Sequence, residues 1–233
     1  MILPLFLFLA LIITGKRGPA LFFLLALICV YLVPAKGIKK VRRYLLLLFA
    51  VLAAVVIIWV FRDTFSRIPL IGRILDSIAG AIEGKDITSG RSRLYAWAIE
   101  LFKRNPLFGI GWGRFRTTVV GNVTKVYDYE VHNIYLQLLA ETGIIGFVAF
   151  TATFVTFWMI TRTAYSKCVN RNLQGEFVWR KLLFFSLTYQ TYFLLYGLSG
   201  NPLYDPFFQL MYIFSCMIAT AYYGAKDTLK MNM

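Results

Sequence analysis

Long apolar runs separated by charged segments constrain the fold of this chain more than any other feature. Six runs carry almost no charge, at residues 2–14, 20–33, 44–61, 134–160, 182–198 and 207–223. Crossing the hydrocarbon core of a bilayer takes roughly 20 apolar residues. Only helices satisfy their own backbone hydrogen bonds inside lipid over a single segment. The sequence therefore predicts an all-α integral membrane protein with about six transmembrane helices.

Composition supports a membrane location over a soluble one. The chain is 59% hydrophobic and 15% charged, and its mean hydropathy is +0.66, outside the usual range of soluble domains. The net charge of +14 could suggest nucleic acid, but basic residues in membrane proteins mark cytoplasmic loops, so we expect no nucleic-acid partner. Three scattered cysteines do not form a disulfide framework.

Basic residues predict the topology. Two short loops, around residues 36–43 and 162–181, are strongly basic and are expected in the cytoplasm. Both termini then lie in the cytoplasm, whereas residues 201–206 lie outside. The longer segment 62–133 also lies outside, as one large extracytoplasmic loop domain between the third and fourth spans. The predicted organisation is therefore three spans in 1–61, the loop domain in 62–133 and three spans in 134–233.

One basic turn contradicts this topology. Lys16 and Arg17 lie between the first two spans, on the side that is predicted to be outside. Two interpretations remain open. The side chains extend to lipid phosphates, or they form a site for an anionic substrate.

The loop domain contains a predicted amphipathic helix in residues 89–104. Its apolar side chains recur at helical spacing and form one stripe: Leu94, Trp97, Ala98, Leu101 and Phe102. Thr88 or Ser89 could cap the start, and Asn105-Pro106 ends the helix. Glu100 lies four residues before Arg104, the spacing of a helical ion pair.

A glycine-rich stretch, NPLFGIGWGRF, follows this helix. Gly109, Gly111 and Gly113 permit backbone turns that other residues avoid. The stretch is either a tight structural turn or a nest of N–H groups near a phosphate or sugar. Its spacing is not that of a dinucleotide-binding loop.

Asp128 and Glu130 are two carboxylates that could in principle hold a divalent metal. Because no further acidic cluster accompanies them, we expect no metal. They either orient a sugar acceptor or His132, or belong to a solvated loop.

His132 is the only histidine, and it precedes a helix that we expect to begin near Ile134. The helix dipole and nearby arginines both disfavour a protonated imidazole and lower its pKa. Neutral imidazole can accept a proton at pH 7. The sequence thus offers either a general base or a satisfied interfacial side chain.

Three stretches carry a family resemblance: SGR at residues 89–91, NPLFGIGWGRF at 105–115 and HNIYLQLLAETGIIG at 132–146. Together with TGKRG at 14–18, they resemble the O-antigen ligase/polymerase family of bacterial membrane proteins. The resemblance implies an outward-facing site in the bacterial cytoplasmic (inner) membrane. A glycan linked through diphosphate to a polyprenol is transferred there to a sugar hydroxyl of a saccharide acceptor, without a cofactor.

The resemblance also implies residue roles. The catalytic histidine corresponds to His132, and the arginines that hold the diphosphate correspond to Arg17 and Arg91, with Lys16 beside them. Asn133, Asp128 and Glu130 are candidates for binding or orienting the acceptor. Direct displacement would invert the anomeric configuration.

The chain departs from the family in one respect, because it resembles only the C-terminal half of longer members. We therefore expect a fragment, a truncated product, or a partner membrane subunit that supplies the missing spans. A polymerase is favoured. The alternatives are a ligase that acts on lipid A core, a non-catalytic assembly protein and, from another class, a transporter subunit in which Arg17 and Arg91 line an anion path.

Overall fold

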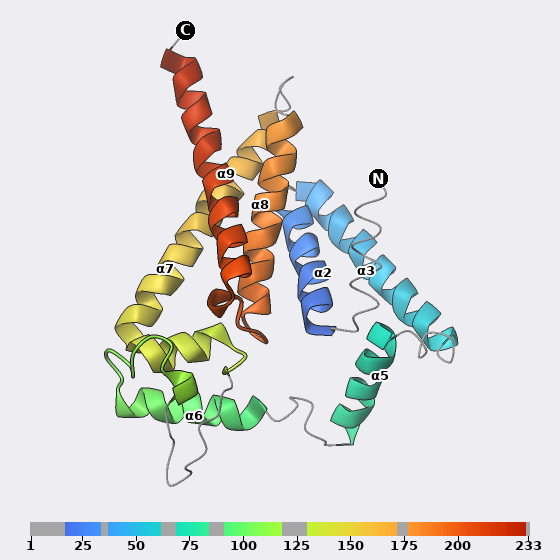
Figure 1. The fold of residues 1–233 in the computed structure, drawn as a ribbon. Coiled ribbons are helices and arrows are strands. Elements are labelled where there is room, and N and C mark those ends of the chain that lie inside the picture. Colours follow the sequence, from blue (N-terminus) through green and yellow to red (C-terminus); the bar gives the residue numbers. More distant parts are fainter. Residues whose placement is uncertain are drawn as a thin grey trace. The chain divides into compact units, whose positions relative to one another are not determined.

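A computed structural model describes residues 17–33, 37–61, 69–83, 91–117, 130–171 and 177–231, and all regular structure in these ranges is helical (Figure 1). The all-helical class is confirmed. The predicted first span, residues 2–14, lies outside the described residues, as do Lys16 and Asp128.

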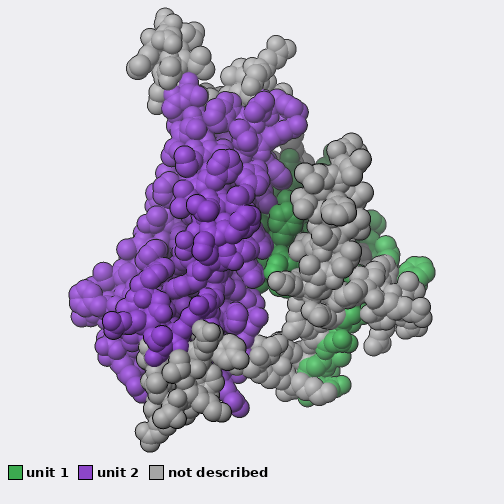
Figure 2. Space-filling model, in the orientation of Figure 1, with its two compact units in different colours: residues 1–89 green, residues 90–233 purple. Residues whose placement is uncertain are grey.

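The chain forms two compact units, unit 1 at Met1–Ser89 and unit 2 at Gly90–Met233 (Figure 2). The division into 1–61, 62–133 and 134–233 follows hydropathy and stays a prediction. His132, the glycine-rich stretch and Arg91 all belong to unit 2.

Unit 1 contains helices α2 (Arg17–Leu32), α3 (Gly37–Val60) and α5 (Pro69–Ile82). At the start of α3, the guanidinium of Arg43 lies 4.6 Å from the centre of the Tyr31 ring, and its Nη1 donates to the Tyr31 carbonyl at 2.6 Å. A basic side chain thus satisfies a carbonyl in the last turn of α2. Helix α5 was not singled out by the sequence analysis.

The predicted amphipathic helix is present as α6, Arg91–Arg104. Ala98 and Leu101 are buried, and Leu94 and Trp97 pack against the same cluster, so the predicted apolar stripe faces the protein. Glu100 and Arg104 form the expected ion pair. The helix ends immediately before Asn105-Pro106, as predicted.

Helices α7 (Ile134–Arg171), α8 (Phe177–Tyr196) and α9 (Pro206–Met231) contact one another as a bundle, and α6 lies against α7 (Figure 1). Among the described residues, two stretches are long and apolar enough to cross a membrane, Ile134–Val169 with a mean hydropathy of 1.9 and Pro206–Ala225 with 1.2. The total of six spans and their orientation stay predictions.

Helix α7 is bent, although the sequence analysis treated residues 134–160 as one run. Gly143 has φ 63° and ψ −167°, which are not helical values. Figure 1 shows the change of direction between the yellow-green start of α7 and its long yellow remainder. The bend separates a short first segment, which follows His132, from the long apolar segment.

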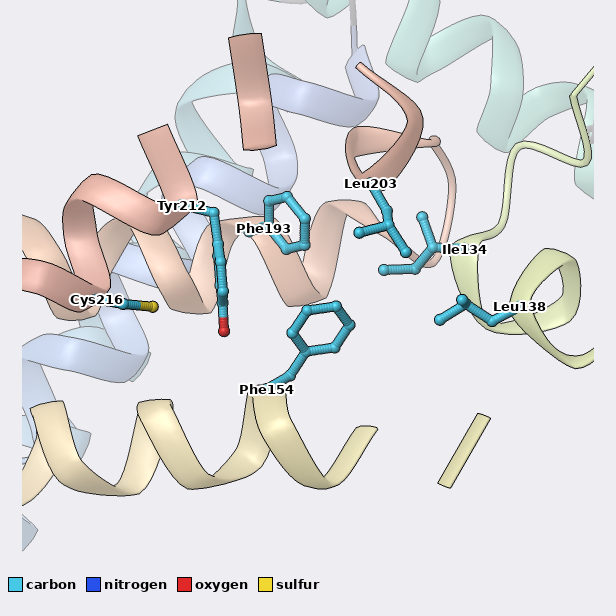
Figure 3. Packing of buried hydrophobic residues seen from close by; sticks show 7 residues of the cluster. All are labelled: Ile134, Leu138, Phe154, Phe193, Leu203, Tyr212 and Cys216. Carbon is cyan, nitrogen blue, oxygen red and sulfur yellow. The ribbon is translucent and has the colours of Figure 1, made fainter. Parts of the chain in front are cut away.

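Aromatic side chains form much of the bundle core (Figure 3). Phe154 of α7, Phe193 of α8 and Tyr212 of α9 meet with ring centres 4.5 to 5.9 Å apart. Leu203 extends this core from a short 3-10 helix, η2 (Pro202–Tyr204), which connects α8 to α9. This packing fixes η2 beside the start of α7.

Candidate active site

The glycine-rich stretch docks into the bend of α7, and we call residues 105–115 the glycine loop. A bend leaves backbone groups of a helix without their usual partners. Here the loop supplies them through four backbone hydrogen bonds of 2.8 to 3.3 Å: Ile110 N–H to Ala140 O, Gly111 N–H to Glu141 O, Ile144 N–H to Pro106 O and Ile145 N–H to Leu107 O. The loop and the bend therefore form one structural element.

Two glycines make this close approach possible. A Cβ on Gly109 would lie 2.4 Å from the carbonyl carbon of Glu141, and one on Gly143 would lie 2.3 Å from the carbonyl oxygen of Leu107. Both residues also have φ values in the left-handed region, which L side chains rarely adopt. Gly113 has φ 72° as well, but a Cβ there would meet nothing within 4 Å.

The N–H groups at the end of the loop converge on a carboxylate of the protein itself. Gly113 N–H donates to Oε2 of Glu141 at 2.7 Å, and Phe115 N–H donates to Oε1 at 3.1 Å. The nest considered for a phosphate or sugar thus binds an internal anion, and in this structure these two N–H groups are occupied.

Glu141 is fully buried (0% exposed), and it is not among the site residues expected from the sequence. Besides the two loop N–H groups, its carboxylate accepts Gln137 Nε2–H at 3.2 Å and the Tyr204 hydroxyl at 2.7 Å. Burial, together with the adjacent carboxylate, raises the pKa of Tyr204, so the phenol keeps the proton that it donates. A single acidic residue within an apolar run was the available sequence signal.

His132 has an unusual backbone conformation, with φ 58°, the one positive φ among the described residues other than glycine. Such values cost free energy and concentrate at functional sites. The residues after His132 hold it in place. Asn133 Oδ1 caps α7 by accepting the N–H groups of Tyr135 and Leu136 at 3.0 Å, and Ile134 N–H donates to Gly197 O at 2.9 Å.

A cavity of about 410 Å³, which we call the polar cavity, opens beside His132. Six other lining residues carry charged or polar side chains: Arg116, Glu130, Tyr196, Asn201, Tyr204 and Asp205. Pro202, Pro206 and Phe208 complete the wall. The cavity therefore combines one imidazole with hydrogen-bonding groups of the kind that bind sugars.

The surroundings of His132 favour its neutral form. Burial is the main cause that lowers the pKa of its imidazole, and the positive charge of Arg91 adds to this, whereas Glu130 acts in the opposite direction. The lowered pKa agrees with the expectation from the sequence, but its leading cause is burial and not the helix dipole or the arginines. The imidazole is therefore available as a proton acceptor at neutral pH.

The structure brings some predicted residues together. Arg91, at the start of α6, donates through Nη1 to the carbonyl and the hydroxyl of Ser199 at 2.8 and 3.0 Å. Glu130 pairs with Arg116 at the polar cavity. Asn133 serves as the helix cap and also donates to Leu198 O at 3.2 Å, so its amide is used by the protein.

Other predicted residues belong to unit 1 or lie outside the described residues. Arg17 begins α2 in unit 1, and a ligand shared with Arg91 stays a prediction. Among the residues that the structure describes, no three His, Cys, Asp or Glu side chains gather as a metal site. Several lining residues that sequence patterns did not indicate come from the segment 201–206, for which the only expectation was a location outside the membrane.

A second cavity, of about 540 Å³, lies between α7, α8 and α9, and we call it the apolar cavity. Aromatic and aliphatic side chains dominate its lining, including Phe150, Phe154, Phe193, Tyr212 and Met217. Helix η2 borders both cavities, because Leu203 lines the apolar one and Tyr204 the polar one. Trp112 of the glycine loop stacks on Tyr204, with ring centres 5.0 Å apart, and lines the apolar cavity.

Known proteins resemble this chain in sequence. Over 92 residues it is 30% identical to the exopolysaccharide production protein ExoQ of Rhizobium meliloti (strain 1021), and the match covers 35% of this chain and 21% of that protein. The chain thus matches about a fifth of the length of this relative. No solved structure matches it.

Residues 2–151 match the family described as O-antigen ligase. This range includes α6, the glycine loop, His132, Glu141 and the bend at Gly143. The match covers more than half of the 233 residues. The chain therefore belongs to the O-antigen ligase family of membrane proteins.

Proposed function

We propose that this chain carries the site of glycan transfer from a polyprenyl-diphosphate-linked oligosaccharide to a sugar hydroxyl, at the outer face of a bacterial cytoplasmic membrane. The observation that carries the proposal is the pairing of two cavities across η2, one polar with His132 and one apolar. An amphiphilic donor has both characters, since its glycan and diphosphate are polar and its polyprenol is apolar. Membership of the O-antigen ligase family agrees with such a donor.

His132 acts as general base in this proposal. Its imidazole accepts the proton of the acceptor hydroxyl while that oxygen forms a bond to the anomeric carbon of the donor. The bond between the anomeric carbon and the diphosphate oxygen breaks, and polyprenyl diphosphate leaves with the bonding electrons. Direct displacement inverts the configuration and needs no metal or nucleotide. A positioned base of this kind typically contributes about 10²–10⁴-fold.

Cationic side chains would hold the diphosphate. Arg91 lies close enough to influence His132, and Arg116 lines the polar cavity. Guanidinium groups suit this role because they stay charged and can bind phosphate through two N–H groups. The N–H groups of Gly113 and Phe115 bind Glu141, so charged side chains must neutralise the diphosphate instead of these N–H groups. Arg17 and Lys16 remain proposed contributors.

A polymerase is the favoured form of this activity. The relative in Rhizobium meliloti is described as an exopolysaccharide production protein, and nothing in the sequence marks a lipid A core acceptor. A ligase that attaches one finished glycan to lipid A core is the second candidate, supported by the family description. Both share the same donor and the same bond-forming step.

The test uses the chain in its native membranes, where any partner subunit is present. Membranes receive a fluorescent polyprenyl-diphosphate oligosaccharide, with or without lipid A core, and products are separated by size. We expect a ladder of lengthening glycans together with released polyprenyl diphosphate, and no ladder from His132→Ala membranes with equal protein content. A single added glycan that requires lipid A core would favour the ligase. Donor that stays intact in wild-type membranes under all conditions would contradict the proposal.

A further inference from the structure

We infer that Glu141 is a positioning residue for His132, because its buried carboxylate joins three segments that contain or directly adjoin residues lining the polar cavity. This inference rests on the proposed function of His132. Glu141 itself does not line the polar cavity, so it acts through other residues and not on the substrate.

Each segment donates to the carboxylate. The glycine loop donates through Gly113 and Phe115, and Phe115 precedes Arg116, which lines the cavity. Helix η2 donates through the hydroxyl of Tyr204, whose side chain is also at the cavity. The first segment of α7 donates through Nε2 of Gln137, which is the fourth donor to the carboxylate. Charge-assisted hydrogen bonds of this type are about twice as strong as neutral ones.

The contact with Gln137 extends the network to His132. Oε1 of Gln137 accepts the N–H of Val131 at 3.2 Å and Nδ2 of Asn201 at 2.6 Å. Val131 immediately precedes His132, and Asn201 lines the polar cavity. Gln137 and Glu141 are 1% and 0% exposed, so water does not compete for these bonds. The backbone on the N-terminal side of His132 is thus tied to the same carboxylate as the loop and η2.

A neutral amide cannot replace this carboxylate. Each oxygen of Glu141 accepts from two donors. In Glu141→Gln one of the oxygens becomes an NH₂ group, which would face two donors whichever way the amide turns. At least one wall of the cavity would then move. Since a misplacement of about 1 Å can lower a rate about 10²-fold, the substitution should act on the chemical step.

His132 reports on the change directly, because it is the only histidine in the chain. The charged or titratable groups near it are Arg91 from α6, Arg116 after the glycine loop, Glu130, which pairs with Arg116, Tyr196 from α8, and Tyr204 and Asp205 from the η2 segment. If the wall opens, water reaches the imidazole, and the main cause that lowers its pKa weakens. The pKa should then rise toward its ordinary value of about 6.5.

The experiment titrates the ¹⁵N-labelled imidazole of the full chain in lipid nanodiscs, with an affinity tag that contains no histidine, and measures transfer kinetics on the same samples. Glu141→Gln should raise the pKa of His132 and lower kcat about 10²-fold, with little change in KM for the donor. Glu100→Gln, in an exposed ion pair of α6, is the matched control and should leave both quantities unchanged.

If Glu141→Gln does not fold in the nanodiscs, Tyr204→Phe is the second test variant. It removes one of the four hydrogen bonds to the Glu141 carboxylate and keeps the aromatic ring stacked on Trp112. It should shift the pKa in the same direction and lower kcat about tenfold, the effect expected for one hydrogen bond to a charged group. An unchanged pKa and kcat in whichever variants assemble overturns the inference and leaves the proposed function intact. A wild-type protein that transfers no glycan removes the proposed function, while the imidazole titration still tests the link to Glu141.

Discussion

The polar and apolar cavities differ in chemistry although one short helix, η2, borders both of them. Charged and polar side chains and His132 line the first, and mainly aromatic and aliphatic side chains line the second. Consecutive residues of η2, Leu203 and Tyr204, face opposite cavities. A 3-10 helix turns about 120° per residue, so neighbouring side chains can contact different environments.

This difference shows how a small segment can create a boundary for an amphiphilic substrate. The polar side is held by hydrogen bonds to Glu141 and Gln137, whereas the apolar side is held by ring packing around Phe193 and Tyr212. Substitutions on the polar side should therefore change the chemical step. Substitutions on the apolar side should change the affinity for the lipid part of the donor.

The largest expected effect concerns the glycine loop, which supports both cavities. Gly109→Ala would place a methyl group 2.4 Å from the backbone of Glu141, and neither backbone can yield without breaking the loop–helix hydrogen bonds. We expect a loss of more than about 3 kcal/mol in the free energy of unfolding, measured by SDS titration in mixed micelles. Gly113→Ala has a similar φ but open space, and should cost about 1–2 kcal/mol. Equal losses in the two variants would contradict the docked loop.

A substitution in the apolar cavity should affect donor binding alone. Met217 lines this cavity and is 61% exposed, so Met217→Trp should narrow the cavity without disturbing the core. We expect KM for the lipid-linked donor to rise about tenfold, the equivalent of roughly two methylene groups kept from burial, with kcat unchanged. Phe214→Trp is the matched control, because Phe214 is also exposed on α9 but does not line the cavity. A fall in kcat with unchanged KM would contradict the assignment of lipid binding to the apolar cavity and of the chemical step to the polar cavity.

The cap at Asn133 should have a moderate effect on the polar side. Asn133→Ala removes the acceptor of two N–H groups at the start of α7. The loss of a helix cap typically costs about 1 kcal/mol, measured by the same SDS titration. Asn133→Asp keeps the acceptor oxygen and should recover most of this loss. If the alanine variant were as stable as the wild type, the cap would not hold His132 in place.

The smallest effect is expected at the ion pair of α6, outside both cavities. Both side chains of Glu100 and Arg104 are about half exposed, at 46% and 50%. Glu100→Ala should therefore change the free energy of unfolding by only about 0.3–0.5 kcal/mol, and less at high salt. Transfer activity should stay at the wild-type level. A large loss of activity would place the C-terminal end of α6 closer to the chemistry than the cavities suggest.

Local sequence patterns predicted local features well. The end of α6, its buried stripe and the start of α7 at Ile134 follow from helical spacing and from breakers such as Asn105-Pro106. His132 stood out because it is the only histidine and precedes a helix. Such signals depend on residues within one or two turns of each other.

The features that the sequence did not predict depend on contacts between distant residues. Asn201 contacts Gln137 across 64 positions, and Tyr204 contacts Glu141 across 63. Hydropathy reports whether a segment is apolar, but not which polar side chain will meet a buried carboxylate. The bend at Gly143 was missed for the same reason, because a loop far earlier in the chain satisfies its backbone groups.

The most direct test of the account is the rate of glycan transfer as a function of pH, measured for the wild type and for His132→Gln in native membranes. The pKa of His132 lies below 6.5, so the wild-type rate should be constant near pH 7 and fall as the pH drops through that lower pKa. His132→Gln can still form hydrogen bonds but cannot take a proton at these pH values. It should be about 10²-fold slower and should lose this acidic decline. A His132→Gln protein that transfers glycan at the wild-type rate, with the same pH dependence, would contradict the assignment of His132 as the base.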